Sequence, residues 1–307
     1  MSALDARPRK RDNHARPRKR DNRAAVAFLL PWFGGLALIT AGPVAASFVL
    51  GFTDYNLIQP PRFNGLTNVH RMLSDERLHH AFGVTVVYVV VSVPLQLAAA
   101  LGLAMLLDRG LRGMAFYRSV FYLPSLLGGS VAIAVLWRQI FGAQGLLNQV
   151  LGVAGVPDRS WIADPDTALS TLIVLNVWTF GAPMVIFLAG LRQIPVMYYE
   201  AAAVDGASRW AQFRAITMPL LSPIIFFNLV LQVIHAFQAF TQAFVVSGGS
   251  GGPSDSTLFY TLYLYQRGFN NFDMGYASAL AWLLLLIIAT FTAVNFWAAR
   301  HWVFYDD

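Results

Sequence analysis

The chain has 307 residues, of which 56% are hydrophobic and 12% are charged, and its formal net charge is +6. A soluble globular protein carries about 25% charged residues, so a soluble surface built from this sequence would be mostly apolar, and a lipid-facing surface is the simpler interpretation. The absence of cysteine excludes disulfides and thiolate metal sites.

Residues 1–23 form a basic tail that holds nine of the 22 Lys and Arg residues. Within it the octapeptide Ala-Arg-Pro-Arg-Lys-Arg-Asp-Asn occurs twice, at 6–13 and 15–22. Such a segment cannot bury enough apolar surface to fold, so we predict a disordered tail. The apolar stretch that follows is too long for a cleavable signal peptide. The tail is interpreted as a topology determinant or, alternatively, as a ligand for anionic lipid headgroups.

Six apolar segments follow, each long enough for the roughly 20 residues that span a bilayer. The sequence therefore predicts an all-α membrane protein, with a membrane domain at 24–299 and a short tail at 300–307. The predicted spans are 24–51, 80–107, 117–141, 168–191, 223–246 and 276–299. Prolines inside them predict kinked or broken helices, at Pro31, Pro43, Pro94, Pro124 and Pro183.

Positive charge predicts the orientation of these spans. With the N-terminus in the cytoplasm, the inner segments hold 16 Lys and Arg residues and the outer segments hold six. Without the tail the count is 7 against 6, so the tail beside the first span decides the bias. We predict that both termini are cytoplasmic, with outer loops at 52–79, 142–167 and 247–275.

The Gly-rich run at 247–253 resembles a phosphate-binding loop only superficially. A Walker A site needs a Lys after its final Gly, and the two lysines, Lys10 and Lys19, both lie in the tail. The chain therefore cannot hydrolyse ATP by that mechanism. The His79–His80 pair has no third residue at ligand spacing, so no metal site is predicted.

An inner segment between the fourth and fifth predicted spans has the pattern of two short helices joined at a glycine. Glu200 is expected to start a helix-forming run, and Gly206 permits a left-handed turn. A second amphipathic stretch carries Trp210, Phe213 and Ile216, and Pro219 is expected to stop it. The sequence predicts a helix–Gly–helix elbow, although an ordinary connecting loop is a competing interpretation.

Polar side chains recur on the fifth predicted span. At 100° per residue they fall on one face over about 21 Å of helix, and they are Asn228, Gln232, His235, Gln238 and Gln242. Polar groups within a membrane are costly unless they face a partner or a water-filled path. We interpret this face as a wall of a solute path, with helix–helix hydrogen bonding as the alternative. Weaker candidates on the fourth span are Asn176, Thr179 and Phe180.

The elbow resembles the signature of permease subunits of binding-protein-dependent ABC importers. The shared features are Glu-Ala-Ala at 200–202, Gly at 206, Ile at 216 and Pro at 219. Other segments are similar to the carbohydrate-uptake branch, the permease type of the maltose transporter: Phe52-Thr53-Asp54-Tyr55-Asn56, Phe116-Tyr117-Arg118, Leu123-Pro124, Gly190-Leu191-Arg192-Gln193-Ile194-Pro195 and Asn271-Phe272-Asp273-Met274-Gly275-Tyr276-Ala277. The resemblance covers about 24–300. Met218 stands where the family usually has Leu, and the Gly-rich run has more glycines than usual.

The resemblance implies a permease subunit that moves a sugar or sugar-like solute, such as an oligosaccharide, a polyol or a glycerophosphate-type molecule, across a bacterial cytoplasmic membrane. It implies no enzymatic activity and no cofactor in this chain, because ATP and Mg are bound by partner subunits. The implied partners are a second permease, two ATPase subunits, an extracytoplasmic solute-binding protein and membrane lipid, with no nucleic acid. The ATPase-coupling residues would be Glu200, Ala201, Ala202, Ala203, Asp205, Gly206 and Ala207.

Two other functional classes are compatible with a polytopic membrane protein. An ion-coupled secondary transporter generally needs an ionisable group or a carbonyl cage inside the membrane, and no Asp or Glu lies in the middle of a predicted span. A membrane enzyme or non-transport scaffold would need a cluster of acids, histidines or serines at one depth, which the sequence does not reveal.

Overall fold

A computed structural model describes residues 21–110 and 113–304. Most of the predicted basic tail and the last three residues of the predicted C-terminal tail lie outside the described residues. Two compact units divide the chain between Val49 and Leu50.

The described part of the first unit, from Asp21, is one helical stretch that ends at the boundary with the second unit. It consists of α1 (Asp21–Gly35), a π-helical turn η1 (Leu36–Ala41) and α2 (Gly42–Leu50). The stretch Val26–Leu50 has 25 residues and is apolar enough to cross a membrane, in agreement with the first predicted span. The π-helical turn lies directly before Pro43, where the missing proline N–H interrupts the regular hydrogen bonding.

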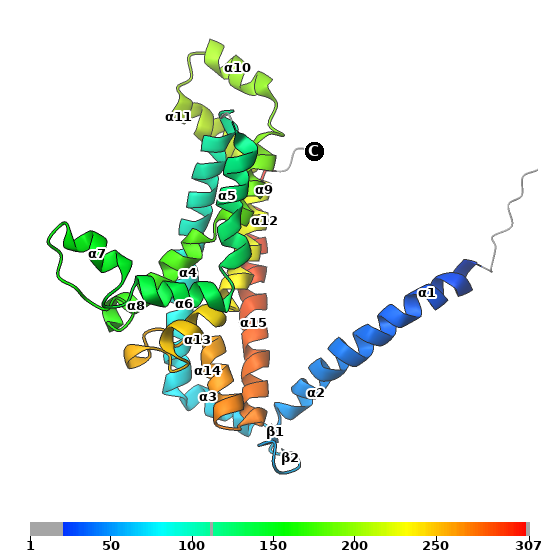
Figure 1. Cartoon of the computed structure of the whole chain (residues 1–307). Coiled ribbons are helices and arrows are strands. Elements are labelled where there is room, and N and C mark those ends of the chain that lie inside the picture. Colours follow the sequence, from blue (N-terminus) through cyan, green and yellow to red (C-terminus); the bar gives the residue numbers. More distant parts are fainter. Residues whose placement is uncertain (1–20, 111–112, 305–307) are drawn as a thin grey trace, which may run out of the picture. The chain divides into compact units, whose positions relative to one another are not determined.

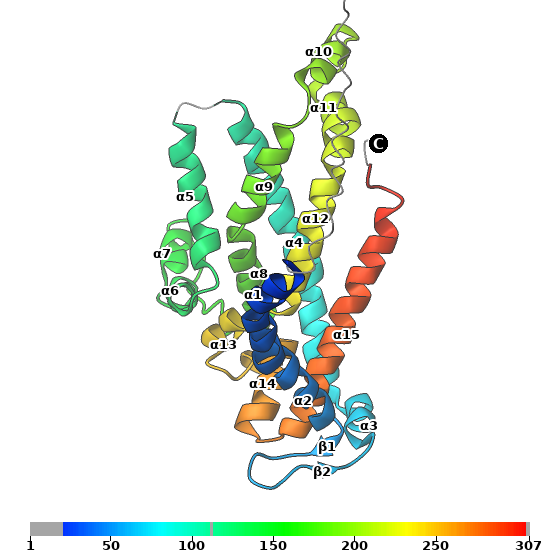
Figure 2. The same cartoon turned by 90° about the vertical axis from the view of Figure 1, so that its right-hand side faces the viewer.

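The second unit is a helical bundle (Figures 1 and 2). It opens with a short antiparallel pair of strands, β1 (Thr53–Asp54) and β2 (Arg62–Phe63), with Thr53 opposite Phe63. The helices follow in the order α3 (Thr67–Ser74), α4 (Glu76–Asp108), α5 (Met114–Leu127), α6 (Val131–Ile140), α7 (Leu146–Gly152), α8 (Pro165–Trp178), α9 (Gly181–Leu191), α10 (Val196–Val204), α11 (Arg209–Gln212), α12 (Met218–Phe237), α13 (Thr241–Ser247), α14 (Tyr260–Tyr265) and α15 (Met274–Ala299). Shorter turns are η2 (Phe213–Thr217), η3 (Pro253–Asp255) and η4 (Gln266–Asn270).

Four helical stretches of the described chain are long and apolar enough to span a membrane, and two bent pairs bring the number to six if each pair is one span. The bent pairs are α5 with α6, at 97°, and α8 with α9, at 42°. The sequence predicts kinked or broken helices in the spans 117–141 and 168–191, at Pro124 and Pro183; both spans are bent, although the bend between α5 and α6 lies after Pro124, which is inside α5. A Gly-Gly pair at 128–129 and the Ser130 N-cap, whose Oγ accepts the N–H of Ile133 at 3.3 Å, separate α5 from α6.

Two ends of this unit lie apart along the bundle (Figure 1). The elbow end comprises α10 and α11, and the far end comprises the strands, α3, α14 and the start of α15. At the far end the N–H of Gly275 donates to the carbonyl of Tyr55 at 3.0 Å, so two of the segments that resemble the importer family are in direct contact.

The core extends into a region that the sequence predicts as an outer loop. Helix α4 packs along α8, α9 and α12. Phe259, Tyr260 and Tyr263, within the predicted loop 247–275, are each at most 1% exposed and pack beside α4. This segment between two spans is therefore not irregular throughout, because its aromatic side chains bury enough apolar surface to order a helix.

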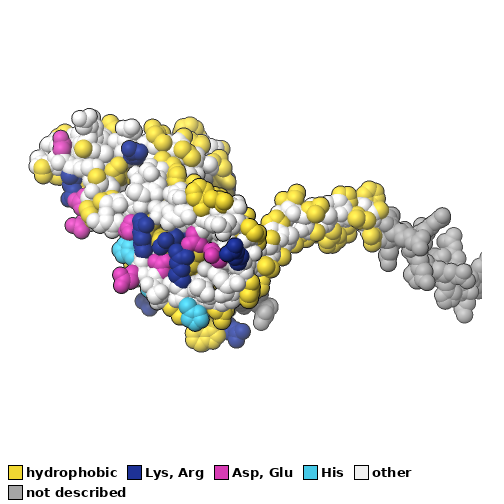
Figure 3. All heavy atoms as spheres, turned by 90° about the horizontal axis from the view of Figure 1, so that it is seen from below, with side chains coloured by type: hydrophobic (Ala, Val, Ile, Leu, Met, Phe, Trp, Pro, Cys, Tyr) yellow, Lys and Arg dark blue, Asp and Glu magenta, His cyan; other side chains and the backbone are white. Residues whose placement is uncertain are grey.

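Charged side chains gather at the far end, where Figure 3 shows Arg and Asp/Glu side chains close together. Asp75 is the centre of this group. It caps α4 by accepting the N–H of Leu78 at 3.1 Å, and it also accepts the hydroxyls of Tyr263 at 2.5 Å and Tyr276 at 2.7 Å. Arg267 approaches it at 3.6 Å. The carboxylate thereby joins the starts of α4 and α15 to α14.

Flanking ion pairs complete this cluster. Arg71 binds Asp273 at 2.6 Å, and Arg77 makes two hydrogen bonds to Asp255, at 2.8 and 2.9 Å. Burial opposes the charge of Asp75, but the hydrogen bonds from Tyr263 and Tyr276 outweigh it and lower the pKa of this carboxyl below its usual 3.8. The charged form of Asp75 is therefore the one that holds the far end together.

Replacing Asp75 with Asn should destabilise the second unit. Asn preserves the helix cap but removes the charge that strengthens the tyrosine and arginine contacts, at a cost of about 1–3 kcal/mol. Thermal unfolding of the purified protein in detergent would measure this loss.

The stabilisation depends on pH in a defined direction. Because the folded pKa is depressed, the stabilisation is fully present above the unfolded pKa of about 3.9 and is lost as pH falls through the lower folded value. The Asn variant should lack this acid-dependent component. Asp158→Asn, at an exposed loop position, is the control, and equal stability of both variants at neutral pH would contradict the role of Asp75.

Candidate functional site

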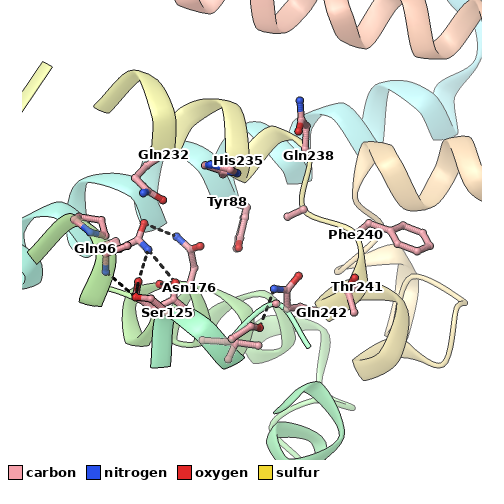
Figure 4. Close-up of a pocket in the computed structure, with 17 residues that line it drawn as sticks. Tyr88, Gln96, Ser125, Asn176, Gln232, His235, Gln238, Phe240, Thr241 and Gln242 are labelled. Carbon is pink, nitrogen blue, oxygen red and sulfur yellow. Dashed lines mark hydrogen bonds between the residues drawn. The ribbon is translucent and has the colours of Figure 1, made fainter. Parts of the chain in front are cut away.

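A cavity of about 400 Å³ lies within the second unit where three helical breaks meet (Figure 4). The breaks are those between α5 and α6, between α8 and α9, and between α12 and α13. The polar side chains that line it come from five helices, the break between α8 and α9 and the segment after α12: Tyr88, Gln96, Ser125, Asn176, Thr179, Gln232, His235, Gln238, Thr241 and Gln242.

The break between α8 and α9 follows from Pro183. Proline has no N–H, so it cannot donate to the carbonyl of Thr179 four residues earlier. That carbonyl instead accepts the hydroxyl of Ser125 at 2.8 Å and the amide of Gln96 at 3.2 Å. Side chains of α4 and α5 thus replace the missing backbone bond, as a freed carbonyl in a membrane segment requires.

Further hydrogen bonds fix these side chains in place. Gln96 Nε2 donates to Thr179 Oγ1 at 2.9 Å, and Asn176 Nδ2 donates to Gln96 Oε1 at 3.4 Å. Ser125 Oγ accepts the N–H of Ala182 at 2.8 Å. Figure 4 shows Gln96, Asn176 and Ser125 as one bonded group on one side of the cavity.

A second group joins the other two breaks. Gln242 Nε2 donates to the carbonyl of Gly128 at 3.1 Å. Gly128 has no side chain because a Cβ there would lie only 2.1 Å from Thr179 Cγ2. Glycine therefore permits the break between α5 and α6 to approach the break between α8 and α9 closely. The hydrogen bond of Gln242 connects both to the break between α12 and α13.

Several polar side chains of the wall remain available for a ligand, among them Gln232, His235 and Gln238. Gln232 is half-buried, whereas His235 and Gln238 are exposed, and within the described residues no hydrogen bond engages any of these side chains. Among the described residues that line the cavity there is no Asp, Glu, Lys or Arg. Amides and an imidazole both donate and accept hydrogen bonds, so this wall suits an uncharged, hydroxyl-rich ligand.

The structure brings six of the eight predicted path residues to this cavity and leaves two outside. The six are Asn176, Thr179, Gln232, His235, Gln238 and Gln242. Asn228 is fully buried and its amide bonds the carbonyl of Ile224 at 3.0 Å, while Phe180 packs beside Phe121. The predicted single helical face was also wrong, because α12 ends at Phe237 and α13 begins only at Thr241.

Sequence reasoning missed the wall residues on other spans. Gln96, Ser125 and Tyr88 reach the cavity from α4 and α5. The sequence offered two signals for these residues. Gln96 is a lone amide in an apolar span, and Ser125 follows a proline. Neither signal indicates which distant carbonyl the side chain meets.

The predicted elbow is present at the other end of the bundle, with different boundaries. Helix α10 begins at Val196 after Pro195, one turn before Glu200, so the prediction that Glu200 starts the helix was wrong. Pro195 takes the N-cap position, where its fixed φ and missing N–H are tolerated.

Gly206 ends α10 in the expected left-handed conformation, with φ of +78°. The N–H of Ala207 bonds the carbonyl of Ala202 at 2.8 Å, and the N–H of Gly206 bonds that of Ala203 at 3.1 Å. This pair of bonds is a Schellman motif. Of the predicted coupling residues, Ala202 and Ala207 are half-buried and the others are exposed: Glu200, Ala201, Ala203, Asp205 and Gly206.

Pro219 does not stop the second helix of the elbow, contrary to prediction. The helical chain runs from α11 through the π-helical turn η2 into α12. The π-helical turn shifts the hydrogen bonding directly before the proline, which lacks an N–H. Tyr199 on α10 also bonds Thr217, with 2.9 Å between the two hydroxyl oxygens. The elbow is therefore joined to the helix that carries Gln232 and His235.

Comparison with known proteins places this arrangement in context. Residues 82–303 match the family model described as binding-protein-dependent transport system inner membrane component. The probable ABC transporter permease protein YesP of Bacillus subtilis is 49% identical over 286 residues, covering 92% of this chain and 93% of that protein. The lactose transport system permease protein LacF of Rhizobium radiobacter is 31% identical, covering 89% and 93%.

Two further matches have the same extent. The trehalose/maltose transport system permease protein MalF of Thermococcus litoralis is 31% identical, covering 92% of this chain and 96% of that protein. A chain in the crystal structure of a bacterial ABC transporter involved in the import of the acidic polysaccharide alginate superposes with a TM-score of 0.78 at 20% identity, covering 92% and 96%. This structural match shows that the fold is shared.

Gln96 and Gln232 should differ in their effect on stability. Gln96→Leu removes two donated hydrogen bonds and one accepted bond, so we expect a loss of about 1–3 kcal/mol. Gln232→Leu removes no hydrogen bond of the described chain and should be nearly neutral. Thermal unfolding in detergent would compare the two, and equal losses would show that Gln96 has no special structural role.

Proposed function

The chain belongs to the family of inner membrane components of binding-protein-dependent transport systems, and we propose that it is the permease subunit of an ATP-driven importer whose solute is a sugar. The observation that carries this proposal is the cavity wall of uncharged amide, hydroxyl and imidazole groups at the three helical breaks. Irregular backbone at membrane depth is tolerated where it lines a cavity.

The solute is an uncharged carbohydrate. Gln232, His235 and Gln238 offer unoccupied donors and acceptors to hydroxyl groups, and the described lining includes no charged carboxylate, ammonium or guanidinium group that would favour an ionic solute. The relatives named for lactose and for trehalose or maltose support this class of solute. Glycerophosphate-type molecules fit the wall less well, because its described lining has no cation for a phosphate, whereas a polyol would meet the same hydrogen-bonding groups as a sugar.

The elbow end is cytoplasmic and the far end is extracytoplasmic. This orientation places 16 of the 22 Lys and Arg residues on the inside, with both termini cytoplasmic, in a bacterial cytoplasmic membrane. It also places the ion-paired cluster around Asp75 outside the apolar spans.

The subunit works with partners that complete the cavity and supply energy. A second permease covers the open side of the wall, where His235 and Gln238 are exposed. Two ATPase subunits bind the elbows of the permease pair and hold the ATP and Mg, and an extracytoplasmic solute-binding protein docks at the far end. A structural relative solved in complex with an alginate pentasaccharide-bound periplasmic protein supports the last partner.

The elbow transmits the ATPase cycle to the cavity. Helix α10 presents Val196, Met197 and Val204 to solvent, at 65, 65 and 89% exposure, as an apolar surface for a partner. The elbow is mechanically connected to the wall residues Gln232 and His235. The Tyr199–Thr217 hydrogen bond and the continuous helical chain from Arg209 to Phe237 make this connection, so the two regions would move together. Closure of the ATPase pair would thus shift the permease between inward-open and outward-open states.

Substitutions of Gly206 test whether the elbow couples ATP hydrolysis to transport. Alanine there must adopt a positive φ at about 1–2 kcal/mol, although no atom obstructs its Cβ, and proline cannot adopt that φ at all. We expect Gly206→Ala to lower solute-stimulated ATP hydrolysis several-fold in the complex co-expressed with its permease, ATPase and binding-protein partners, and Gly206→Pro to abolish it.

Gly206→Asn is the matched variant, because Asn tolerates the left-handed conformation and should retain most of the activity. Full stimulated hydrolysis by Gly206→Pro would rule out the proposed coupling. Loss in the Asn variant equal to that of Pro would point to a role of the glycine other than its backbone conformation.

A substitution of Gln232 tests whether the cavity wall binds the solute. Gln232→Leu removes a hydrogen-bonding group from the cavity, so sugar uptake by the complex in proteoliposomes should fall about ten-fold, corresponding to one lost hydrogen bond of 1–2 kcal/mol. Basal ATP hydrolysis and copurification of the ATPase should be unaffected. Gln149→Leu, on the exposed face of α7, is the control. Unchanged uptake by Gln232→Leu would remove this residue from the path.

A further inference from the structure

Four aromatic rings contact one another between the cavity and the far end of the second unit; Tyr265 and Phe269 are stacked, and the other pairs are tilted or edge-to-face. Phe240 follows α12, Phe244 lies on α13, Tyr265 ends α14 and Phe269 lies in η4. Their centroids are 5.3 Å apart for Phe240–Phe244 and Phe240–Tyr265, 5.4 Å for Phe244–Tyr265 and 5.1 Å for Tyr265–Phe269. We call this group the aromatic ladder.

The ladder is open at both ends. Phe240 lines the cavity and points away from Gln232 and Gln96 in Figure 4. Phe269, at the other end, is 55% exposed, and Phe244 and Tyr265 are half-buried. The ladder therefore differs from the sealed aromatic core of the same region, in which Tyr260 and Tyr263 are at most 1% exposed.

The Gly-rich run packs beside the ladder at Phe244. Gly249 bonds the carbonyl of Phe244 through its N–H at 2.7 Å. A Cβ on Gly249 would lie 3.1 Å from the Phe244 ring, so a larger residue would press on the ladder. Gln266 Nε2 holds this run in place by donating to the carbonyl of Gly249 at 2.8 Å. Gly249 is thus the glycine of this run that lies against the ladder, whereas Gly251 and Gly252 face Leu258 and Thr257.

The chemistry of the ladder suits a sugar ring. The face of an aromatic ring carries partial negative charge, and the C–H groups on one face of a pyranose ring carry partial positive charge, so the two faces attract. The hydroxyl of Tyr265 has no hydrogen-bond partner among the described residues and can bind a sugar hydroxyl. A linear polyol has no flat ring face to stack.

We infer that the aromatic ladder is a second sugar-binding site, on which a pyranose ring stacks as it passes between the far end and the cavity. This inference rests on the proposed function. In this inference the ladder binds the face of the sugar ring, whereas the amide wall of the cavity binds the hydroxyl groups of the sugar.

The test uses the complete complex, with its binding protein, in proteoliposomes. Lactose, trehalose and maltose serve as ring probes and sorbitol as the linear probe. Tyr265→Leu and Phe269→Leu keep apolar volume but remove the ring face, so the uptake rate of a ring sugar at saturating binding protein should fall about two- to ten-fold. Tyr265→Phe keeps the ring and should restore most of the rate. Phe28→Leu replaces an aromatic residue that is 84% exposed on α1 and should have no effect.

Two further readouts separate sugar stacking from other roles. The binding-protein concentration for half-maximal ATP hydrolysis should not change, since a rise would identify the ladder as a protein-docking surface and overturn the inference. Any sorbitol uptake should not fall in the leucine variants, since an equal fall would show that no ring face is recognised.

The failures of the two proposals are distinguishable. If the wild-type complex takes up a ring sugar and both leucine variants match it, the ladder has no role and the proposed function stands. If the wild-type complex takes up none of the three sugars, the sugar assignment fails and the ladder inference fails with it.

Discussion

The hydrogen bonds to the carbonyl of Thr179 are the interaction on which the rest of the site depends. Pro183 leaves this carbonyl without its helical partner, and an unpaired carbonyl inside an apolar bundle costs several kcal/mol. Ser125 and Gln96 supply the bonds from two other helices. The same bonds hold α4, α5 and the bend between α8 and α9 together, so a local backbone defect becomes the tertiary contact that shapes the cavity.

The chain separates its polar functions by position. Charged pairs stand at the far end, around Asp75, where water can solvate them. Uncharged amides and hydroxyls line the cavity, where a charge would be costly. The continuous helix from Arg209 to Phe237 connects the elbow with this wall, so a movement at one end reaches the other without a flexible joint. This division of roles suits a subunit that moves an uncharged solute by changing its conformation.

Several features could be predicted from the sequence because they depend on local pattern. Apolar length indicated the spans, and the Glu-Ala-Ala motif with Gly206 indicated an elbow, whose glycine has the expected left-handed conformation. The polar residues of the fifth span indicated one wall of the cavity, of which Gln232 and His235 lie on α12. Prolines indicated broken helices, although Pro94 and Pro124 lie within unbroken α4 and α5.

What the sequence by itself determined is therefore the approximate extent and the polarity of the spans, since hydropathy, charge and glycine conformation act within a few residues. The tertiary structure alone decided which breaks meet and which side chains satisfy them. Gln96 and Ser125 belong to the wall because each hydrogen-bonds the Thr179 carbonyl at the break between α8 and α9. Asn228 lies outside the wall, and its amide bonds a carbonyl of its own helix. The aromatic stretch after Ser256 became a buried helix for the same reason, since its apolar partners on α4 lie more than a hundred residues away along the chain.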